Sequence, residues 1–276
     1  FKNHVSALFW SLGNESYAGD ILVEMNRYYK EKDPDRLVHY EGVAENRPYE
    51  DLISDMESQM YAPPEKIKEY LENNPKKPFI LCEYMHDMGN SLGGMESYIR
   101  LLDQYEDYQG GFIWDYIDQS IYKKDRYGKE FQAYGGDFGE RPTDYNFSGN
   151  GIAYGGNRDA SPKMQEVKFN YQNITAQVSA DSVNLINKNL FVNTDTFECR
   201  VTLQKDGNVI RTEVLDTAVA PLSQMEYALP FKKEEKAGEY TVTVSFHLKE
   251  DKPWAKAGHE VAFGPVSYTH LTLPTT

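Results

Sequence analysis

Few features of the sequence point to a membrane, a nucleic acid or a disulfide framework. Its 276 residues include two cysteines, Cys82 and Cys199, and neither has a second Cys or a His at the spacing of a zinc site. No run approaches the roughly 18 apolar residues that a membrane span needs. Lys and Arg number 29 against 43 Asp and Glu, whereas nucleic acids and anionic membranes are bound through clustered Lys and Arg. We therefore expect no nucleic-acid partner and no membrane association.

Aromatic residues, by contrast, are plentiful. The chain has 21 Tyr, 13 Phe and 3 Trp, which is enough apolar ring surface to build a core and to line a binding site. A disordered acidic chain would be poor in aromatics, so disorder is excluded. At roughly 150 residues per domain, the length suggests about two domains.

Short apolar runs alternate with helical patterns in the first half of the chain. Residues 5–12 form a mostly apolar run, as expected for a strand buried on both faces. Asp20 is the expected N-cap of the following helix, and Pro63-Pro64 opens a later one. Strands that alternate with helices predict parallel βα units, and therefore an open α/β sheet or part of a (β/α)₈ barrel. The other expected strands are residues 37–40, 60–61, 79–82 and 110–114.

From about Tyr171 the apolar residues recur with a period of two, which is typical of antiparallel strands. Asp206-Gly207 is a strong signal for a hairpin turn, and residues 240–248 alternate apolar side chains with Thr and Ser. This half predicts an antiparallel sandwich of roughly one hundred residues. Residues 127–162 show little periodicity and are expected to be functional or a linker.

The two ends of the sequence suggest a fragment. The first residue is Phe1 rather than Met, no signal segment opens the chain, and residues 267–276 contain no acidic residue. We expect this last stretch to be a non-native tail and exclude it from fold reasoning. The predicted domains are residues 1–165 and 166–266, and the scarcity of cysteine leads us to expect a cytoplasmic protein.

Two glutamates directly follow predicted strands, Glu15 after the first and Glu83 after the fourth. In a parallel α/β fold the carboxyl ends of the strands converge on one face, where sites form. Either could be a cap or a surface residue, but an unpaired carboxylate beside an apolar strand is costly. Two carboxylates across an aromatic-walled cleft suit glycoside hydrolysis, although such pairs also serve as metal ligands or ion pairs. The residues that could stack on a sugar are Tyr61, Tyr84 and Trp114, and those that could bind its hydroxyls are Asn14, His86 and Asn150.

Four sequence blocks resemble glycoside hydrolase family 2. Residues 11–16 (SLGNES) look like that family's acid/base signature, and residues 80–91 (ILCEYMHDMGNS) closely resemble the nucleophile signature of its large β-galactosidases. Residues 110–115 (GGFIWD) and 134–139 (YGGDFG) match further blocks. The resemblance covers residues 1 to about 264. It implies a fold class of α/β plus all-β: about strands 4–8 of a (β/α)₈ TIM barrel, followed by an immunoglobulin-like antiparallel β-sandwich.

The resemblance also implies a retaining β-galactosidase, which removes terminal β-D-galactose from substrates such as lactose in two steps. Glu15 would be the general acid/base and also a magnesium ligand. Glu83 would be the nucleophile that forms a covalent galactosyl-enzyme. Tyr61 would assist the nucleophile, with Met60 packing beside it, and Asn14 would bind the sugar 2-hydroxyl.

Further roles implied by the resemblance concern the rest of the sugar and the cofactors. His86 would hold a galactose hydroxyl, and Trp114 would be the sugar platform. The carbonyl of Phe147 and the side chain of Asn150 would match a sodium site at the sugar 6-hydroxyl. Magnesium and sodium are thus the implied cofactors, with other ligands outside this chain, and the whole protein is expected to form a homo-oligomer, a tetramer or a dimer. Because five of eight barrel strands leave two open edges, we expect the isolated chain to fold poorly and to have little or no activity.

Other interpretations stay open at this level. The enzyme could act on a β-glucuronide or a β-mannoside, although residues 80–91 favour a galactoside. The chain could also be a non-catalytic carbohydrate-binding or assembly module, although such a module does not need both carboxylates. His39 is expected to have a core role, and Cys82 to be buried and inert. Glu41 could be either a partner of the site or part of a structural ion pair, and Asp118 is expected to hold its loop in place.

Overall fold

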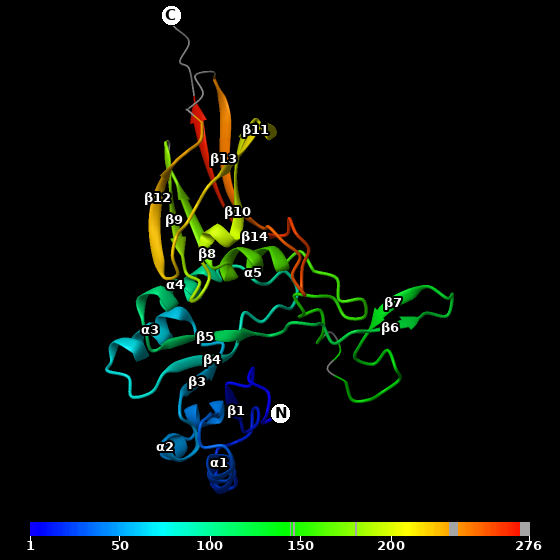
Figure 1. Ribbon diagram of the computed structural model, residues 1–276. Coiled ribbons are helices and arrows are strands. Elements are labelled where there is room, and N and C mark those ends of the chain that lie inside the picture. The colour runs from blue at the N-terminus through cyan, green and yellow to red at the C-terminus, as the bar shows by residue number, and fades with distance from the viewer. Residues whose placement is uncertain (144, 146, 180, 232–236, 271–276) are drawn as a thin grey trace, which may run out of the picture. The chain divides into compact units, whose positions relative to one another are not determined.

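The computed structural model describes residues 1–143, 145, 147–179, 181–231 and 237–270. Its contacts divide the chain into two units, Phe1–Val167 and Lys168–Thr276 (Figure 1). The division falls beside the predicted boundary at residues 165 and 166. No helix among the described residues is long and apolar enough to cross a membrane.

The first unit is built from parallel strands joined by helices. β1 pairs with β2 in parallel, and β3, β4 and β5 form a three-stranded parallel sheet in that order. The prediction of parallel βα units is confirmed in this form. The elements are β1 (Phe9–Ser11), α1 (Asp20–Lys32), β2 (Leu37–His39), the 3₁₀ helices η1 (Glu41–Ala44) and η2 (Arg47–Tyr49), α2 (Glu50–Ile53), β3 (Glu57–Met60), α3 (Pro64–Glu72), β4 (Phe79–Tyr84), α4 (Glu96–Gln104) and β5 (Tyr108–Ile113).

Helix α3 shows how the sequence anchors the strand that carries Glu83. The helix starts at Pro64, whose fixed φ angle suits the first helical position. Ile67 and Leu71, four residues apart, lie on one face and are both buried. They belong to the same core cluster as Leu81 of β4, so the packing of α3 fixes the strand behind the candidate site.

Two expectations for the start of the chain are wrong. β1 covers only Phe9–Ser11 of the expected strand at residues 5–12, and Val5 and Leu8 are 93% and 75% exposed. Among the described residues β1 pairs with β2 alone, so its other edge has no neighbour that would bury these side chains. Asp20 is the first residue of α1 rather than its N-cap, which is Gly19. The Asp20 carboxylate instead accepts a hydrogen bond from the Tyr49 hydroxyl at 2.9 Å.

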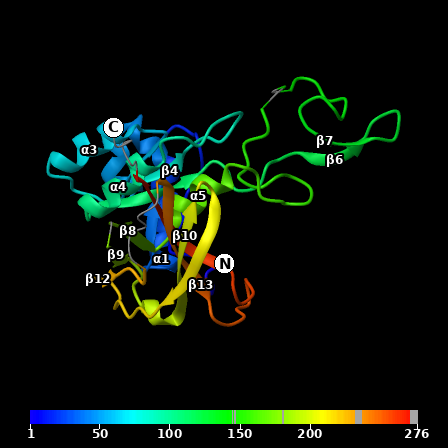
Figure 2. The ribbon, with the colours of Figure 1, turned by 90° about the horizontal axis from the view of Figure 1, so that it is seen from above.

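The segment expected to be irregular contains part of a hairpin. β6 (Ile121–Lys124) and β7 (Glu130–Ala133) pair in antiparallel fashion, and Figure 2 shows them side by side. The Asp125 carboxylate accepts the backbone N–H groups of Tyr127 and Lys129, which closes the turn. Strands of four residues give too short an alternation for sequence reasoning to recognise. Helix α5 (Met164–Tyr171), also not predicted, contains the boundary between the units.

The second unit is β-rich and has two antiparallel sheets. One has the order β11-β10-β13-β14 and the other β12-β9-β8. Val183 and Leu185 of the smaller sheet share one core cluster with Val201, Leu203 and Val244 of the larger sheet, so the sheets enclose a common core. The strands are β8 (Ile174–Val178), β9 (Ser182–Asn187), β10 (Phe197–Lys205), β11 (Asn208–Leu215), β12 (Ser223–Ala228), β13 (Gly238–Leu248) and β14 (Glu260–His270), with the 3₁₀ helix η3 (Thr194–Thr196) before β10.

The predicted hairpin of the second unit is confirmed. β10 and β11 pair around Asp206 and Gly207, whose φ angles of 48° and 78° are those of a turn that suits the twist of antiparallel strands. The prediction of a strand at residues 240–248 is also confirmed, by β13. The backbone of β14 pairs with β13 as far as His270. The predicted non-native tail thus overlaps β14, while residues 271–276 lie outside the described residues, and the origin of this stretch stays a prediction.

Candidate active site

Glu83 and Tyr61 meet at the carboxyl ends of two adjacent parallel strands. The Tyr61 hydroxyl donates a hydrogen bond to Glu83 Oε2 at 2.6 Å, and the Tyr61 backbone N–H donates to the Glu83 carbonyl at 2.8 Å. Met60, half-buried, is the register partner of Glu83 across β3 and β4. Tyr61 has a φ of 53°, so its backbone turns sharply where the strand ends. The strand ends therefore bring the predicted nucleophile into contact with its predicted assistant.

The Tyr61 hydroxyl is a proton donor at neutral pH. Burial raises the pKa of Tyr61, and the hydrogen bond and negative charge of Glu83 raise it further, with a smaller contribution from the Glu15 charge. A neutral phenol donates a hydrogen bond to the Glu83 carboxylate. Hydrogen bonds from O–H to a carboxylate are among the strong ones, so this contact stabilises the anionic form of Glu83.

Replacing Tyr61 with phenylalanine removes the 2.6 Å hydrogen bond and keeps the ring. A hydrogen bond to a charged group contributes about 1.5–3 kcal/mol, so we expect kcat to fall about 10- to 100-fold, with a smaller change in KM. Steady-state kinetics measure this in a full-length enzyme that carries residues 1–266 of this chain. An unchanged kcat would show that the hydroxyl does not support Glu83 during turnover.

Glu15 follows β1 and presents an exposed carboxylate. Its backbone lies in the left-handed region at φ 54°, and its N–H donates to Glu41 Oε1 at 2.6 Å. Burial raises the pKa of Glu41, and the negative charges of Glu83 and Glu15 both raise it further. Glu41 therefore contacts the Glu15 backbone directly, and the charges of Glu15 and Glu83 both act on its pKa.

Aromatic rings form a row beside Glu83. The rings of Tyr61 and His86 lie 5.6 Å apart, and those of His86 and Phe147 also lie 5.6 Å apart. Tyr61 and Phe147 are 38% and 49% exposed, so part of this row faces solvent and can contact a ligand. A sugar ring presents C–H faces that pack on such surfaces.

Asn150 connects Trp114 to Asp118. With its amide oriented to satisfy both neighbours, Asn150 accepts from Trp114 Nε1 at 3.0 Å and donates to Asp118 Oδ1 at 3.3 Å. The backbone carbonyl of Asn150 accepts the backbone N–H of Asp115 at 2.7 Å. Asn150 is 1% exposed, so these contacts hold a buried amide in one orientation.

Asp118 holds the segment that carries Phe147 and Asn150. It accepts the Ser148 hydroxyl at 3.0 Å and the Gly149 N–H at 2.8 Å. Although burial favours the neutral acid, these hydrogen bonds keep the pKa of Asp118 below its ordinary value. This is the loop-holding role expected for Asp118.

Lys163, which sequence reasoning did not single out, links the same segment to the residues that follow β4, the strand that carries Glu83. Its ammonium group donates to the carbonyls of Asp87 and Gly149 and lies 3.5 Å from Asp87 Oδ1. Asp87 directly follows His86, so Lys163 joins the two segments that carry predicted sugar-binding residues. No local motif marks this lysine, because its partners lie 76 and 14 residues away.

The predicted residues are not all linked by direct contacts. Asn14 is exposed beside Glu15, and its carbonyl accepts the Ser16 hydroxyl at 3.4 Å. Tyr84, offered as a stacking residue, is 2% exposed and lies in the core cluster with Leu81, so a stacking role for it is wrong. The ring is buried because β4 turns this side chain toward α4, where it packs on Tyr98.

His39, Glu41 and Cys82 place three possible ligand atoms within 4.8 Å of one another. His39 is hydrogen-bonded to Ser11 at 3.0 Å and to Ser58 at 2.7 Å, so both of its ring nitrogens are engaged. Burial lowers the pKa of His39 to about 4 and raises that of Cys82 to about 11. His39 is buried and is a neutral imidazole, as its expected core role requires. Cys82 is a neutral thiol but only half-buried, so the expectation that it is buried is wrong.

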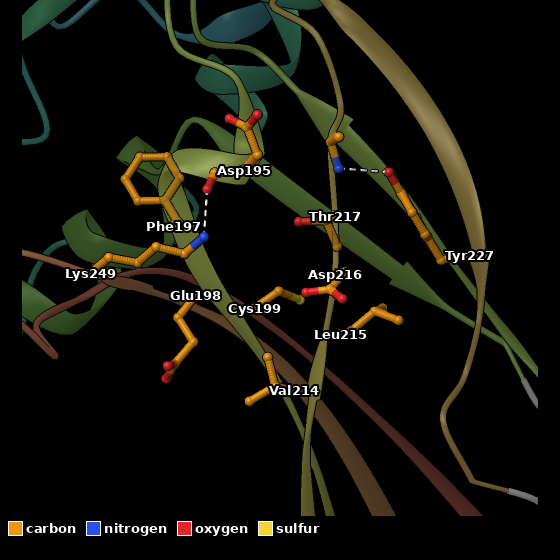
Figure 3. Close-up of a pocket in the computed structure, with 11 residues that line it drawn as sticks. Asp195, Phe197, Glu198, Cys199, Val214, Leu215, Asp216, Thr217, Tyr227 and Lys249 are labelled. Atoms are coloured by element: carbon orange, nitrogen blue, oxygen red, sulfur yellow. Dashed lines mark hydrogen bonds between the residues drawn. The ribbon is translucent and has the colours of Figure 1, made fainter.

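Two pockets among the described residues hold none of the predicted catalytic residues. One, of about 620 Å³, lies in the first unit next to Ser148, Gly149 and Lys163. The other, of about 420 Å³, lies in the second unit and is shown in Figure 3. It is bounded by the backbone between β11 and β12, where the Tyr227 hydroxyl accepts the Ala218 N–H, and by Lys249, which donates to the Asp195 carbonyl.

Side-chain and backbone oxygens of the predicted ligands suit the two implied metals. The exposed Glu15 carboxylate suits one ligand position of magnesium, which prefers carboxylate oxygen. The Asn150 amide oxygen accepts from Trp114 and keeps one further lone pair for a cation. Carbonyl oxygens such as that of Phe147 suit hard cations too. The donor set therefore fits one magnesium ligand and two sodium ligands.

Comparison with known families identifies this arrangement. Residues 1–176 match the family described as "Glycosyl hydrolases family 2, TIM barrel domain", and residues 183–268 match "Beta-galactosidase, domain 4". The first unit therefore belongs to the class of glycosyl hydrolase TIM-barrel domains. The chain is a member of glycosyl hydrolase family 2, which confirms the predicted family.

Curated relatives of the chain are named beta-galactosidases. The chain is 55% identical to a "Beta-galactosidase" of Halalkalibacterium halodurans over 97% of this chain and 26% of the relative, and 51% identical to one of Clostridium acetobutylicum over 95% and 29%. It is 64% identical to a "Beta-galactosidase large subunit" of Latilactobacillus sakei over 62% of this chain and 27% of the relative. The chain thus spans about a quarter of the length of the curated relatives that it matches.

Proposed function

We propose that this chain is the part of a retaining β-galactosidase that carries both catalytic carboxylates. The observation that carries the proposal is the 2.6 Å hydrogen bond between Tyr61 and Glu83 at neighbouring strand ends. Retaining glycosidases use two carboxylates, one as nucleophile and one as acid/base. The relatives named beta-galactosidase support a galactoside rather than a glucuronide or a mannoside, and the paired carboxylates do not suit a mere binding module.

The proposed first step uses Glu83 as nucleophile on the anomeric carbon of galactose. The Tyr61 hydroxyl orients the attacking carboxylate through its hydrogen bond to Oε2. Glu15 protonates the departing glycosidic oxygen, so the aglycone leaves as an alcohol and a galactosyl-Glu83 ester remains. In the second step Glu15 removes a proton from water, which attacks the same carbon and releases galactose with retained configuration.

The remaining predicted residues bind the sugar. We assign Asn14 to the 2-hydroxyl, Trp114 to the apolar face, and His86 to a ring hydroxyl. Asn150 and the Phe147 carbonyl suit a sodium ion at the 6-hydroxyl, and Glu15 suits one position of a magnesium ion. When bound, these ions would supply positive charge near the sugar and the acid/base.

For the fold we propose part of a (β/α)₈ barrel, about strands 4–8, and an immunoglobulin-like sandwich. The parallel pairing of β1 with β2 and of β3, β4 and β5 supports the first assignment. The common core between two antiparallel sheets supports the second.

A chimeric enzyme tests the function directly. Residues 1–266 replace the matched segment of the Halalkalibacterium halodurans beta-galactosidase, and nitrophenyl β-galactoside hydrolysis is measured. We expect the chimera to turn over within about tenfold of the unmodified relative, and the isolated chain to show little or no hydrolysis. A folded chimera without activity, or one that prefers the glucuronide, would contradict the proposal.

A further inference from the structure

A buried carboxylate holds the backbone of the proposed acid/base. Glu41 is 5% exposed and lies at the carboxyl end of β2, at the start of η1. Its Oε1 accepts the Glu15 N–H at 2.6 Å. Among the described residues Glu41 has no lysine or arginine partner, so the ion-pair interpretation that the sequence left open is not the one observed.

Tyr40, the residue before Glu41, contacts the backbone of the residue that follows Glu15. The Tyr40 hydroxyl accepts the Ser16 N–H at 3.0 Å and donates to the Ser16 carbonyl. Tyr40 is fully buried, which fixes its hydroxyl in place. Gly42 leaves room for this approach, because a Cβ there would lie 2.6 Å from the Ser16 carbonyl oxygen. Residues 40–42 therefore hold the backbone of residues 15–16 through the hydrogen bonds of Glu41 and Tyr40 and the close approach at Gly42.

These contacts hold an uncommon backbone conformation: Glu15 has a φ of 54°, which non-glycine residues rarely adopt. Such a conformation persists only where surrounding structure determines it. Because the Glu15 side chain is exposed, its direction depends on this backbone angle.

We propose that Glu41 is a positioning residue for the acid/base: its carboxylate holds the left-handed backbone of Glu15 and thereby aims the Glu15 side chain at the glycosidic oxygen. This inference rests on the proposed function and names a role for a residue that does not touch the substrate. A loss of positioning should harm the steps that need proton transfer and spare the step that does not.

The test compares two substrates in the chimera. A methyl or alkyl galactoside needs protonation of its leaving group, whereas a 2,4-dinitrophenyl galactoside does not. For Glu41→Met, which cannot accept the Glu15 N–H, we expect kcat/KM on the alkyl galactoside to fall about 100-fold, and kcat/KM on the dinitrophenyl galactoside to stay within about threefold. Glu41→Gln keeps an acceptor oxygen and should recover most of the loss.

Glu57→Met is the matched control. Glu57 is about as buried as Glu41, but it is the first residue of β3 rather than a residue at the carboxyl end of a strand. There it forms an ion pair with Arg47. We expect Glu57→Met to lower kcat/KM on the alkyl galactoside and on the dinitrophenyl galactoside by the same factor, because it reduces stability. Equal losses on the two substrates for Glu41→Met, or a Glu41→Gln variant as damaged as Glu41→Met, would overturn the positioning role.

Hydrogen exchange provides a readout independent of turnover. In the peptide that contains Glu15, Glu41→Met should speed exchange of the Glu15 amide at least tenfold, while Glu41→Gln and Glu57→Met should not. Unchanged exchange in Glu41→Met would refute the contact even if the chimera were inactive. Inactivity of the unsubstituted chimera would count against the proposed function alone.

Discussion

Replacing Glu83 with glutamine in the chimera should lower kcat by about 10⁴-fold or more, because glutamine cannot form the galactosyl ester. The substitution keeps the shape of the side chain and an oxygen that accepts the Tyr61 hydroxyl at its present 2.6 Å. The loss should therefore appear without a large change in substrate affinity or in melting temperature. Pre-steady-state and steady-state hydrolysis of a nitrophenyl galactoside measure it.

A control distinguishes the nucleophile from a general effect of charge. Glu106→Gln removes an exposed carboxylate before β5 and should leave kcat within about twofold. Full turnover by Glu83→Gln would exclude Glu83 as nucleophile and would leave its contact with Tyr61 as a structural one.

Replacing Glu15 with alanine should lower kcat/KM on an alkyl galactoside by about 10²- to 10⁴-fold, the range of general acid–base catalysis. The dinitrophenyl galactoside should form the galactosyl-enzyme nearly as fast as before, because its leaving group needs no proton. The second step should then be slow, since no base activates water. Added azide, which needs no base, should raise kcat and yield β-galactosyl azide.

Glu24→Ala is the corresponding control for Glu15. Glu24 is an exposed glutamate of α1 that pairs with Arg27 on the same helix. It should show neither the substrate dependence nor the azide effect. An α-configured azide product, or equal losses on both substrates for Glu15→Ala, would contradict the assignment of Glu15 as acid/base.

The sequence predicted site residues best where a residue type that carries chemistry directly follows a predicted strand. Glu83 follows a run of apolar residues that must be a buried strand, and such a strand of a parallel fold ends at the site face. The helix at Pro64 and the turn at Asp206-Gly207 were predictable because local stereochemistry decides them. The family blocks then identified Glu15 and Glu83 together.

What the sequence could not provide depends on contacts between distant residues. The bond from Glu15 to Glu41 spans 26 residues and requires β1 and β2 to pair in one register. The Trp114–Asn150–Asp118 contacts and the Lys163 bridge likewise appear only after folding. The short exposed β1 was mispredicted because apolar composition alone does not say whether a neighbouring strand is there to cover it.

The most direct test of the account is the identity of the labelled residue after trapping with a 2-deoxy-2-fluoro-β-galactoside that carries an activated leaving group. The fluorine slows both steps, and the good leaving group lets the covalent intermediate accumulate. Peptide mass spectrometry of the inactivated chimera should place one fluorogalactosyl group on Glu83, with none after Glu83→Gln. Label on Glu15 or on another residue would contradict the central claim that Glu83 is the nucleophile.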